Sequence, residues 1–260
     1  MSVLDFPRGI ELAGTERKLL DRSGNWRGAV VYEDLGVLWR PRGSASIYHR
    51  RYVPEGTGEI REVCSYEFDR AMGLGYVPMT IWRQHDGTFG SLQRWLPNTF
   101  EEWKPATPDN DRESGKPSWD TLGEQRAIEL WTLDAVLMNV DSVWTNYLWS
   151  EEAQAAARVD NCECLPPPEA VNAARSLPRE HPADGYNWPL PWWRGLLHNL
   201  PIPTSLLARL SALDWNPLKK AWQDIGLEPD AADAAEERAR AILRLGRVDT
   251  EEVWGLRDPH

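Results

Sequence analysis

The chain has 260 residues, of which 42% are hydrophobic and 27% charged, and its formal net charge is −11. This length suits one large domain or two lobes, and the composition is ordinary for a globular protein. The negative charge argues against a general nucleic-acid binder and against binding to anionic membranes, because both need a basic face. Two basic stretches, WRPRG (39–43) and HRRY (49–52), are either solvated strand ends or part of a phosphate site.

The cysteines argue against a disulfide scaffold and a zinc site, and the apolar pattern argues against a signal peptide and a membrane span. Cys64, Cys162 and Cys164 are too few and odd in number for a disulfide framework, and CEC lacks a second Cys or His pair that would favour zinc. The N-terminus has no basic segment followed by an apolar run, and no apolar stretch reaches about 18 residues. We therefore expect a cytoplasmic protein without a membrane span. Most of the 15 tryptophans are expected in the core, and a few could stack on a ligand.

The first hundred residues favour strands around a single helix. Short runs rich in β-branched and aromatic residues predict strands, and a segment without Pro that ends at Gly73 predicts a helix. The expected elements are strands within 18–42 (AVVY and GVLW, joined by EDLG), a helix over 59–73, and strands over 76–84 and 89–96 joined by HDG at 85–87.

The remaining residues favour a linker followed by helices. Residues 97–118 are rich in Pro, Asp, Asn and Ser, which is typical of a loop or linker. The expected elements are helices over 120–139, 203–213 and 230–247, strand–turn–strand over 146–164, and irregular packing with short helices over 165–200. The sequence thus predicts an α+β protein with a β-rich N-terminal lobe (1–97), a linker (98–118) and a mainly helical C-terminal lobe (119–260).

This order of elements favours a nucleotide cleft between two lobes. Phosphoryl transfer from ATP needs a loop over the phosphates, a cation on a strand, a helical acid that fixes it, an Asp near the acceptor and oxygen ligands for Mg²⁺. Candidates for these parts occur in the same order: Ser23, Gly24 and Asn25 in the loop, Arg40, Glu62, then Gln93, Arg94 and Trp95 near the adenine, and finally Asp141, Asn146 and Asp160. Each of these residues could alternatively be an ordinary turn, cap or solvated surface residue.

Six short motifs, spread over about residues 20–250, carry a resemblance to a known family. They are LWRP (38–41), REVCSYEFDRAMGLGYVPMT (61–80), GSLQRWLP (90–97), LDAVLMNVDSVWTN (133–146), VDNCEC (159–164) and AAEERARAILRLGR (234–247). In this order they resemble the phosphatidylinositol 3-/4-kinase-related and HipA-type kinases of the protein-kinase-like fold, and the small bacterial members most of all. The resemblance implies a two-lobed kinase-like fold, with ATP and Mg²⁺ as cofactors and a protein Ser/Thr acceptor.

The resemblance also implies a role for each matching residue. Asp141 corresponds to the catalytic Asp, and Asn146 and Asp160 correspond to the Mg²⁺ ligands. Glu62 corresponds to the helix acid that pairs with the strand cation, for which Arg40 stands where the family has Lys.

Two departures from the family pattern leave alternative functions open. Arg40 replaces a Lys, and an Arg is longer and forked. Ser142 stands where many relatives have a cation beside the catalytic Asp. The first alternative is therefore a pseudokinase that binds nucleotide and serves as a protein-interaction module. A weaker alternative is nucleotidyl transfer to protein.

Overall fold

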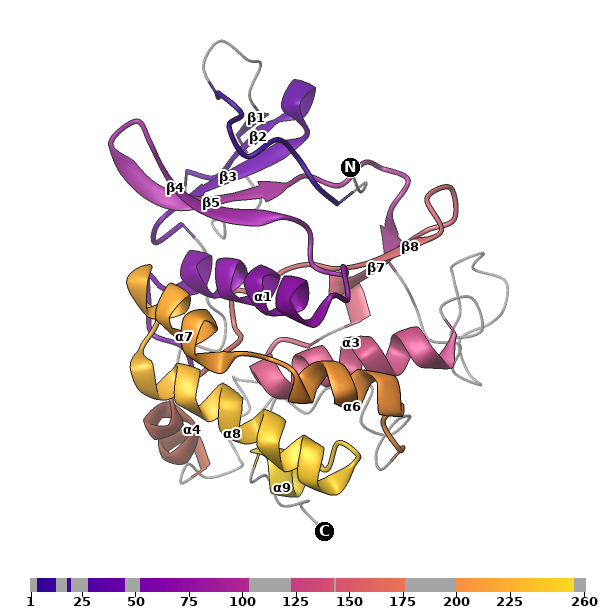
Figure 1. The fold of residues 1–260 in the computed structure, drawn as a ribbon. Coiled ribbons are helices and arrows are strands. Elements are labelled where there is room, and N and C mark those ends of the chain that lie inside the picture. The colour runs from indigo at the N-terminus through magenta and orange to yellow at the C-terminus, as the bar shows by residue number, and fades with distance from the viewer. Residues whose placement is uncertain are drawn as a thin grey trace, which may run out of the picture.

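The computed structural model describes residues 4–12, 18–19, 28–44, 52–102, 123–142, 144–175 and 200–254. In these ranges helices occur together with antiparallel sheets, so the α+β class predicted from the sequence is confirmed. Figure 1 shows the larger sheet at one end of the molecule and most of the helices at the other. Within the described ranges, no helix has both the length and the apolar character that a membrane crossing requires.

The larger sheet contains five antiparallel strands in the spatial order β1-β2-β3-β5-β4. Its strands are β1 (Lys18–Leu19), β2 (Val30–Tyr32), β3 (Val37–Pro41), β4 (Thr80–His85) and β5 (Thr88–Arg94). A 3₁₀ turn, η1 (Glu33–Leu35), connects β2 to β3. Between β4 and β5, Asp86 and Gly87 both have positive φ, at 49° and 77°, as a two-residue type I′ hairpin turn requires.

Helix α1 (Gly58–Met72) follows β3 in the chain and packs against β4 and β5 (Figure 1). Most of its residues are buried, and it ends at Gly73, whose φ of 65° lies in the left-handed region. The helix predicted over 59–73 is therefore confirmed. The predicted strand over 76–84 begins later, at Thr80, because Pro78 has no N–H to donate and Asp69 binds the N–H groups of Gly75 and Tyr76 instead.

A second sheet contains three short antiparallel strands in the order β6-β7-β8. The strands are β6 (Glu101–Glu102), β7 (Tyr147–Ser150) and β8 (Ala155–Arg158), and the 3₁₀ turn η3 (Trp144–Asn146) precedes β7. β6 corrects the prediction of an unstructured linker from residue 98, because it pairs with β7. Residues 103–118 of that linker lie outside the described ranges, as do the SGN turn and HRRY up to residue 51.

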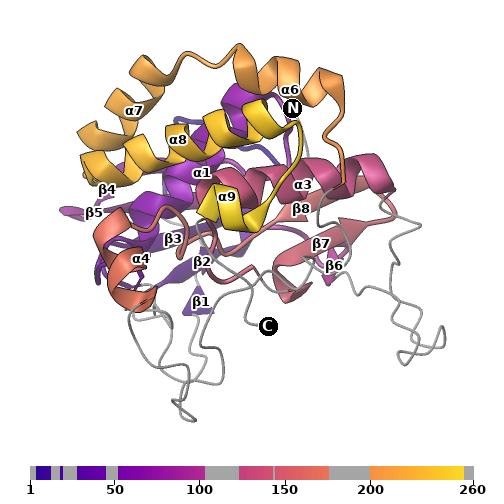
Figure 2. The ribbon, with the colours of Figure 1, turned by 90° about the horizontal axis from the view of Figure 1, so that it is seen from below.

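The remaining helices form the other half of the molecule (Figure 2). They are α3 (Glu124–Leu137), α4 (Pro168–Arg175), α6 (Thr204–Ser211), α7 (Trp215–Asp224), α8 (Pro229–Leu245) and α9 (Thr250–Trp254). α8 contacts α3, α4, α6, α7 and α9. Its buried residues Ala231, Ala235 and Ala239 recur every four positions, so small side chains form the stripe that faces these neighbours.

Candidate functional site

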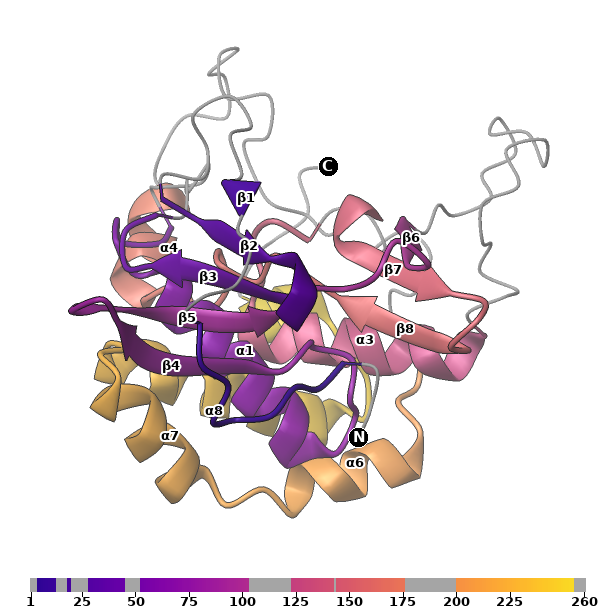
Figure 3. The ribbon, with the colours of Figure 1, turned by 90° about the horizontal axis from the view of Figure 1, so that it is seen from above.

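A cavity of about 340 Å³ lies between the larger sheet and the second sheet. Figure 3 shows these two sheets side by side, with β3 and β5 nearest to β7 and β8. The apolar part of the wall comes from Leu38, Leu96, Pro97, Phe100, Leu148 and Val159, and the polar part from Arg40, Gln93, Arg94, Trp95, Asn98, Asn146 and Asp160. The cavity wall therefore combines apolar side chains with charged side chains of both signs.

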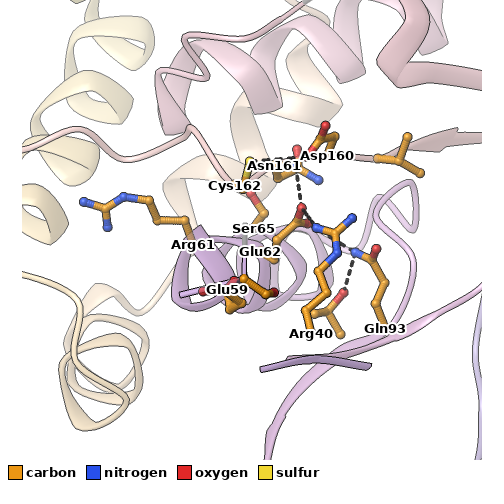
Figure 4. Close-up of polar contacts among 12 residues, drawn as sticks. Arg40, Glu59, Arg61, Glu62, Ser65, Gln93, Asp160, Asn161 and Cys162 are labelled. Atoms are coloured by element: carbon orange, nitrogen blue, oxygen red, sulfur yellow. Dashed lines mark hydrogen bonds and ion pairs between the residues drawn. The ribbon is translucent and has the colours of Figure 1, made fainter. Parts of the chain in front are cut away.

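A buried ion pair between Arg40 and Glu62 lies at the wall of the cavity (Figure 4). Arg40 Nη1 of β3 donates to Glu62 Oε1 of α1 at 2.7 Å, and the two side chains are only 4% and 1% exposed. Gln93 Nε2 donates to the other oxygen of Glu62 at 3.2 Å and to Thr80 Oγ1 at 3.0 Å. Burial raises the pKa of Glu62 and Asp160 raises it further, while the Arg40 guanidinium lowers it. The pair holds a guanidinium at a fixed place in the cavity wall.

Asp160 is fixed beside this ion pair by the turn that follows β8. Its φ of 56° is unusual for a residue other than Gly, so neighbouring contacts must hold the turn. Asn161 supplies them: its N–H donates to Glu62 Oε1 at 3.0 Å, and its side chain donates to the Arg158 carbonyl at 3.4 Å. The Asn139 side chain also donates to Asn161 Oδ1 at 3.3 Å. The turn thus connects the helix acid to the loop that precedes η3.

That loop brings Asp141 and Asn146 together. The Asp141 N–H donates to Asn139 Oδ1 at 3.0 Å, and Asn146 Nδ2 donates to the Asp141 carbonyl at 2.9 Å and to its carboxylate at 3.5 Å. Both bonds of Asn146 use its amide nitrogen. Its amide oxygen is therefore the atom that can ligate a cation in the cavity.

A buried hydrogen-bond network centred on Asp134 holds the loop that contains Asp141 and Ser142. Asp134 of α3 accepts hydrogen bonds from Ser142 Oγ at 2.6 Å, from Arg158 Nε at 3.2 Å and from the Tyr147 hydroxyl. The Arg158 guanidinium also lies 4.8 Å from the Tyr147 ring centroid. Burial raises the pKa of Tyr147 well above its usual value, and Asp134 raises it further, so Tyr147 stays a neutral hydrogen-bond donor. Asp134 is thus a structural hydrogen-bonding residue, and Ser142 is one of its partners.

The C-terminal turn of α3, directly before this loop, is held by its own continuing chain and by three other segments. A helix leaves its last four carbonyls without helical partners. Here the Asp134 carbonyl accepts from the backbone of residues 138 and 139, and Leu137 accepts from the Leu165 N–H at 2.6 Å. The Ala135 carbonyl accepts from Trp254 Nε1 at 2.7 Å, and Val136 accepts from Arg238 Nε at 2.6 Å. The start of the Asp141 loop is therefore fixed by α8, α9 and the chain after Asp160.

Most of the residues predicted for the site lie at this cavity. Its lining includes Arg40, Gln93, Arg94, Trp95, Asn146 and Asp160. Glu62 lies behind Arg40, and Asp141 is hydrogen-bonded to Asn146. The Arg94 guanidinium instead donates to the Gly36 carbonyl at 3.1 Å. Ser23, Gly24 and Asn25 lie outside the described residues.

Four residues beside the cavity were not predicted from the sequence: Asn139, Asn161, Thr80 and Cys162. The three polar residues act through contacts between distant segments, which no local pattern indicates. For Cys162 the signal was CEC, but its partners are not Cys or His: one ligand atom each of Glu62, Asp160 and Cys162 lie within 4.8 Å of one another.

Two sets of residues could therefore hold a metal ion, and both contain Asp160. In the group with Glu62 and Cys162, the carboxylate is already bonded to Arg40 and the Cys162 thiol donates to Asp160 at 3.3 Å. Burial raises the pKa of Cys162 well above its usual value, which disfavours the thiolate that metals bind. The oxygen atoms of Asn146 and Asp160 fit Mg²⁺ better.

The arrangement can therefore bind a polyanion together with a hard cation beside apolar side chains. Arg40 supplies the fixed positive charge, and Asn146 and Asp160 supply oxygen ligands. Asp141 lies next to Asn146 as a carboxylate that could accept a proton. No protein-family model matches the chain, and no curated protein matches its sequence.

Proposed function

We propose that the protein binds ATP with Mg²⁺ in the 340 Å³ cavity and transfers the terminal phosphoryl group, as a cytoplasmic protein Ser/Thr kinase similar to the HipA type. The observation that carries this proposal is the buried ion pair between Arg40 and Glu62, which borders the cavity beside Asp160. In protein kinases a strand cation paired with a helix acid binds the phosphates, and an Asp and an Asn bind the metal. Here Arg40, Asn146 and Asp160 line one cavity, and Glu62 is bonded to Arg40 behind its wall.

The arrangement of the elements supports the same proposal. In the larger sheet, α1 is inserted between β3 and β4, and the strand order is β1-β2-β3-β5-β4. This is the arrangement expected for the N-terminal lobe of a protein-kinase-like fold. The second sheet and the helices from α3 to α9 would form the C-terminal lobe, and the cavity lies where the two parts meet.

Each residue then has a chemical role. The adenine would occupy the slot formed by Leu38, Leu148 and Val159, next to the chain after β5. Arg40, held by Glu62, would bind phosphate oxygens. Asn146 and Asp160 would hold Mg²⁺, which neutralises charge on the phosphates when it is bound.

Asp141 would orient the acceptor hydroxyl and take its proton. The hydroxyl oxygen would form a bond to the terminal phosphorus while the bond from that phosphorus to the leaving ADP oxygen breaks. The acidic surface favours a protein acceptor over a lipid in an anionic membrane.

The proposal is tested by binding and by transfer, each with a matched control. We expect ATP with Mg²⁺ to raise the melting temperature of the purified protein, and Asp160→Asn to abolish that rise. Asp224→Asn, an exposed carboxylate on α7, should behave like the wild type. A rise that is absent in the wild type, or equal in Asp160→Asn, would overturn the proposed nucleotide site.

Transfer is then followed with ATP labelled at the terminal phosphate. We expect label on the protein itself or in released phosphate, and neither with Asp160→Asn. Binding without either product would favour the pseudokinase. Label from the α-phosphate on protein would favour nucleotidyl transfer.

A further inference from the structure

A second cavity of about 240 Å³ lies between α4, α8 and α9, and it shares no residue with the first. Figure 2 shows α4 and α9 along the same side of α8. The wall is mixed: Pro166, Val171 and Trp254 form part of its apolar portion, and Asn172 and two glutamates contribute to its polar portion. Met138, the residue that ends α3, also lines it. The cavity therefore reaches the end of α3, where the chain enters the Asp141 loop.

One charged side chain, Arg238 of α8, is buried in the wall of this cavity. It is only 6% exposed. Its Nε donates to the Val136 carbonyl, and its Nη1 lies 4.0 Å from the Met138 sulfur. Its Nη2 is buried and has no hydrogen-bond partner among the residues that the structure describes. Burial lowers the pKa of Arg238 to about 10, although Cys164 and Glu237 raise it, so the guanidinium remains charged at neutral pH.

Arg238 differs from the other buried arginines of the described residues. Arg40, Arg61 and Arg158 each form an ion pair, with Glu62, Glu228 and Asp134 respectively. Arg238 forms no ion pair with any carboxylate in the described ranges. The carbonyl end of α3 offers it only partial negative charge. Among the described residues Glu237 acts on Arg238 only through space, and a buried cation without a directly paired carboxylate is unfavourable. Here that cation borders a cavity.

We propose that this cavity binds a small organic carboxylate with an apolar body, and that Arg238 binds the carboxylate group. A planar guanidinium matches a carboxylate, and the apolar part of the wall, with Val171 and Trp254, matches a short hydrocarbon part. The volume is below the roughly 300 to 1,000 Å³ typical of pockets for drug-sized ligands, so the ligand is small. Glu237 and Glu252 also line the cavity and are exposed, so they repel phosphate dianions and favour a single negative charge or a zwitterion.

The binding test uses two carboxylate probes, 4-methylpentanoate and L-leucine, without ATP, so it does not depend on the proposed kinase activity. Melting temperature is followed against probe concentration. We expect a saturable rise with both carboxylates. No rise is expected with 4-methylpentan-1-ol or L-leucinamide, which lack the carboxylate. Inorganic phosphate should give a smaller rise than either carboxylate.

Three variants locate the site. In Arg238→Met the midpoint concentration should rise by roughly tenfold or more, since a charged hydrogen bond is lost. Ala234→Leu should fill the cavity and abolish the rise while Arg238 stays in place. Arg240→Met, on the exposed side of the same helix, should bind like the wild type.

Two outcomes would overturn the proposal: no saturable rise with either carboxylate, or a rise that persists in Ala234→Leu. Ala234→Leu decides alone if Arg238→Met does not fold. A larger rise with phosphate than with both carboxylates would overturn the assignment of the ligand class.

Discussion

Ser142 Oγ, in the residue directly after Asp141, donates to Asp134 Oδ2 at 2.6 Å. The positive charge at this place comes from Arg158 of β8, which donates to the same Asp134. Burial lowers the pKa of Arg158, but Asp134 raises it above its usual value, with smaller contributions from Tyr147 and Asp141. The loop around Ser142 therefore does not lack a nearby positive charge, because the Arg158 guanidinium of β8 contacts the same Asp134 carboxylate.

Removing Asp134 should destabilise the protein strongly. Asp134→Ala would leave Arg158, which is fully buried, without its carboxylate, and the loss of one partner of a buried ion pair costs about 3–5 kcal/mol of unfolding free energy. Urea denaturation measures this loss. Asp233→Ala on α8, where the carboxylate is 59% exposed, should change stability by less than about 1 kcal/mol. Equal losses for the two variants would contradict a structural role for Asp134.

Placing at position 142 the cation that the resembled kinases carry should harm the protein. Ser142→Arg would place a second guanidinium beside Arg158 in a buried site, so we expect lower stability and no gain in phosphate transfer. Ser142→Ala removes the hydroxyl contacts to Asp134 and Tyr147 and should cost about 1–3 kcal/mol. Denaturation and label transfer on both variants check this. Higher phosphate transfer by Ser142→Arg would mean that Arg158 does not take the place of the cation that the resembled kinases carry at this position.

Arg40 should matter for nucleotide binding through its charge. Arg40→Met should weaken binding of ATP with Mg²⁺ by at least about tenfold, because a charged contact to phosphate is lost. Arg40→Lys keeps the charge without the forked geometry and should retain part of the affinity. Calorimetric titration measures both. Arg42→Met is the control, since Arg42 is exposed and hydrogen-bonds only weakly, to the Gly56 carbonyl at 3.3 Å. Undiminished binding by Arg40→Met would contradict the assigned role.

Asp69 should make stability depend on pH. Burial raises the pKa of Asp69 from 3.8 to about 6, although the N–H groups of Tyr76, Val77 and Gly75 lower it. Because the folded state holds this proton up to a higher pH than the unfolded state, the contribution of Asp69 to stability falls as pH rises from 4 to 6, by about 3 kcal/mol in total.

Asp69→Asn removes that titration and isolates the effect. The unfolding free energy of Asp69→Asn minus that of the wild type should increase by about 3 kcal/mol between pH 4 and pH 7. Denaturation at several pH values measures the difference. A difference that stays constant, or that decreases with pH, would show that the carboxylate is not the titrating group.

Gly90 should be needed for the position of Arg40. A Cβ at Gly90 would press on the Arg40 carbonyl oxygen and lie 2.9 Å from Pro41 Cα. Gly90→Ala should therefore displace β3, lower stability by about 1–3 kcal/mol and weaken nucleotide binding. Gly9→Ala is the matched control, because nothing lies within 4 Å of its Cβ position. Wild-type stability and binding in Gly90→Ala would exclude this steric role.

Elements with a strong local signal were predictable from the sequence. α1 has a clear end at Gly73, and the Asp86–Gly87 turn has the sequence of a type I′ hairpin. α7 was missed because Pro217 lies within it. Pro217 is in the first turn, where no helical partner is needed for its nitrogen, and the Asp214 side chain caps the helix at Asn216 N.

The candidate site was predictable where the order of motifs indicated it, and not where contacts join distant segments. Arg40, Glu62, Asn146 and Asp160 could be chosen from their order along the chain. The support from Asn139, Asn161 and Arg158 depends on how α1, α3 and β8 meet in space. The same reason applies to Cys162, whose neighbours Glu62 and Asp160 are not the Cys or His residues that a local metal motif requires.

The carbonyl contacts at the end of α3 have a consequence for genetics. Ala135 and Val136 depend on donors from Trp254 and Arg238, far along the chain from Asp141. Alleles that inactivate the protein should therefore map to two stretches, one around residues 139–160 and one in α8 and α9. Those in the second stretch should be rescued by low growth temperature or by a stabilising suppressor, and those at Asp141 or Asp160 should not.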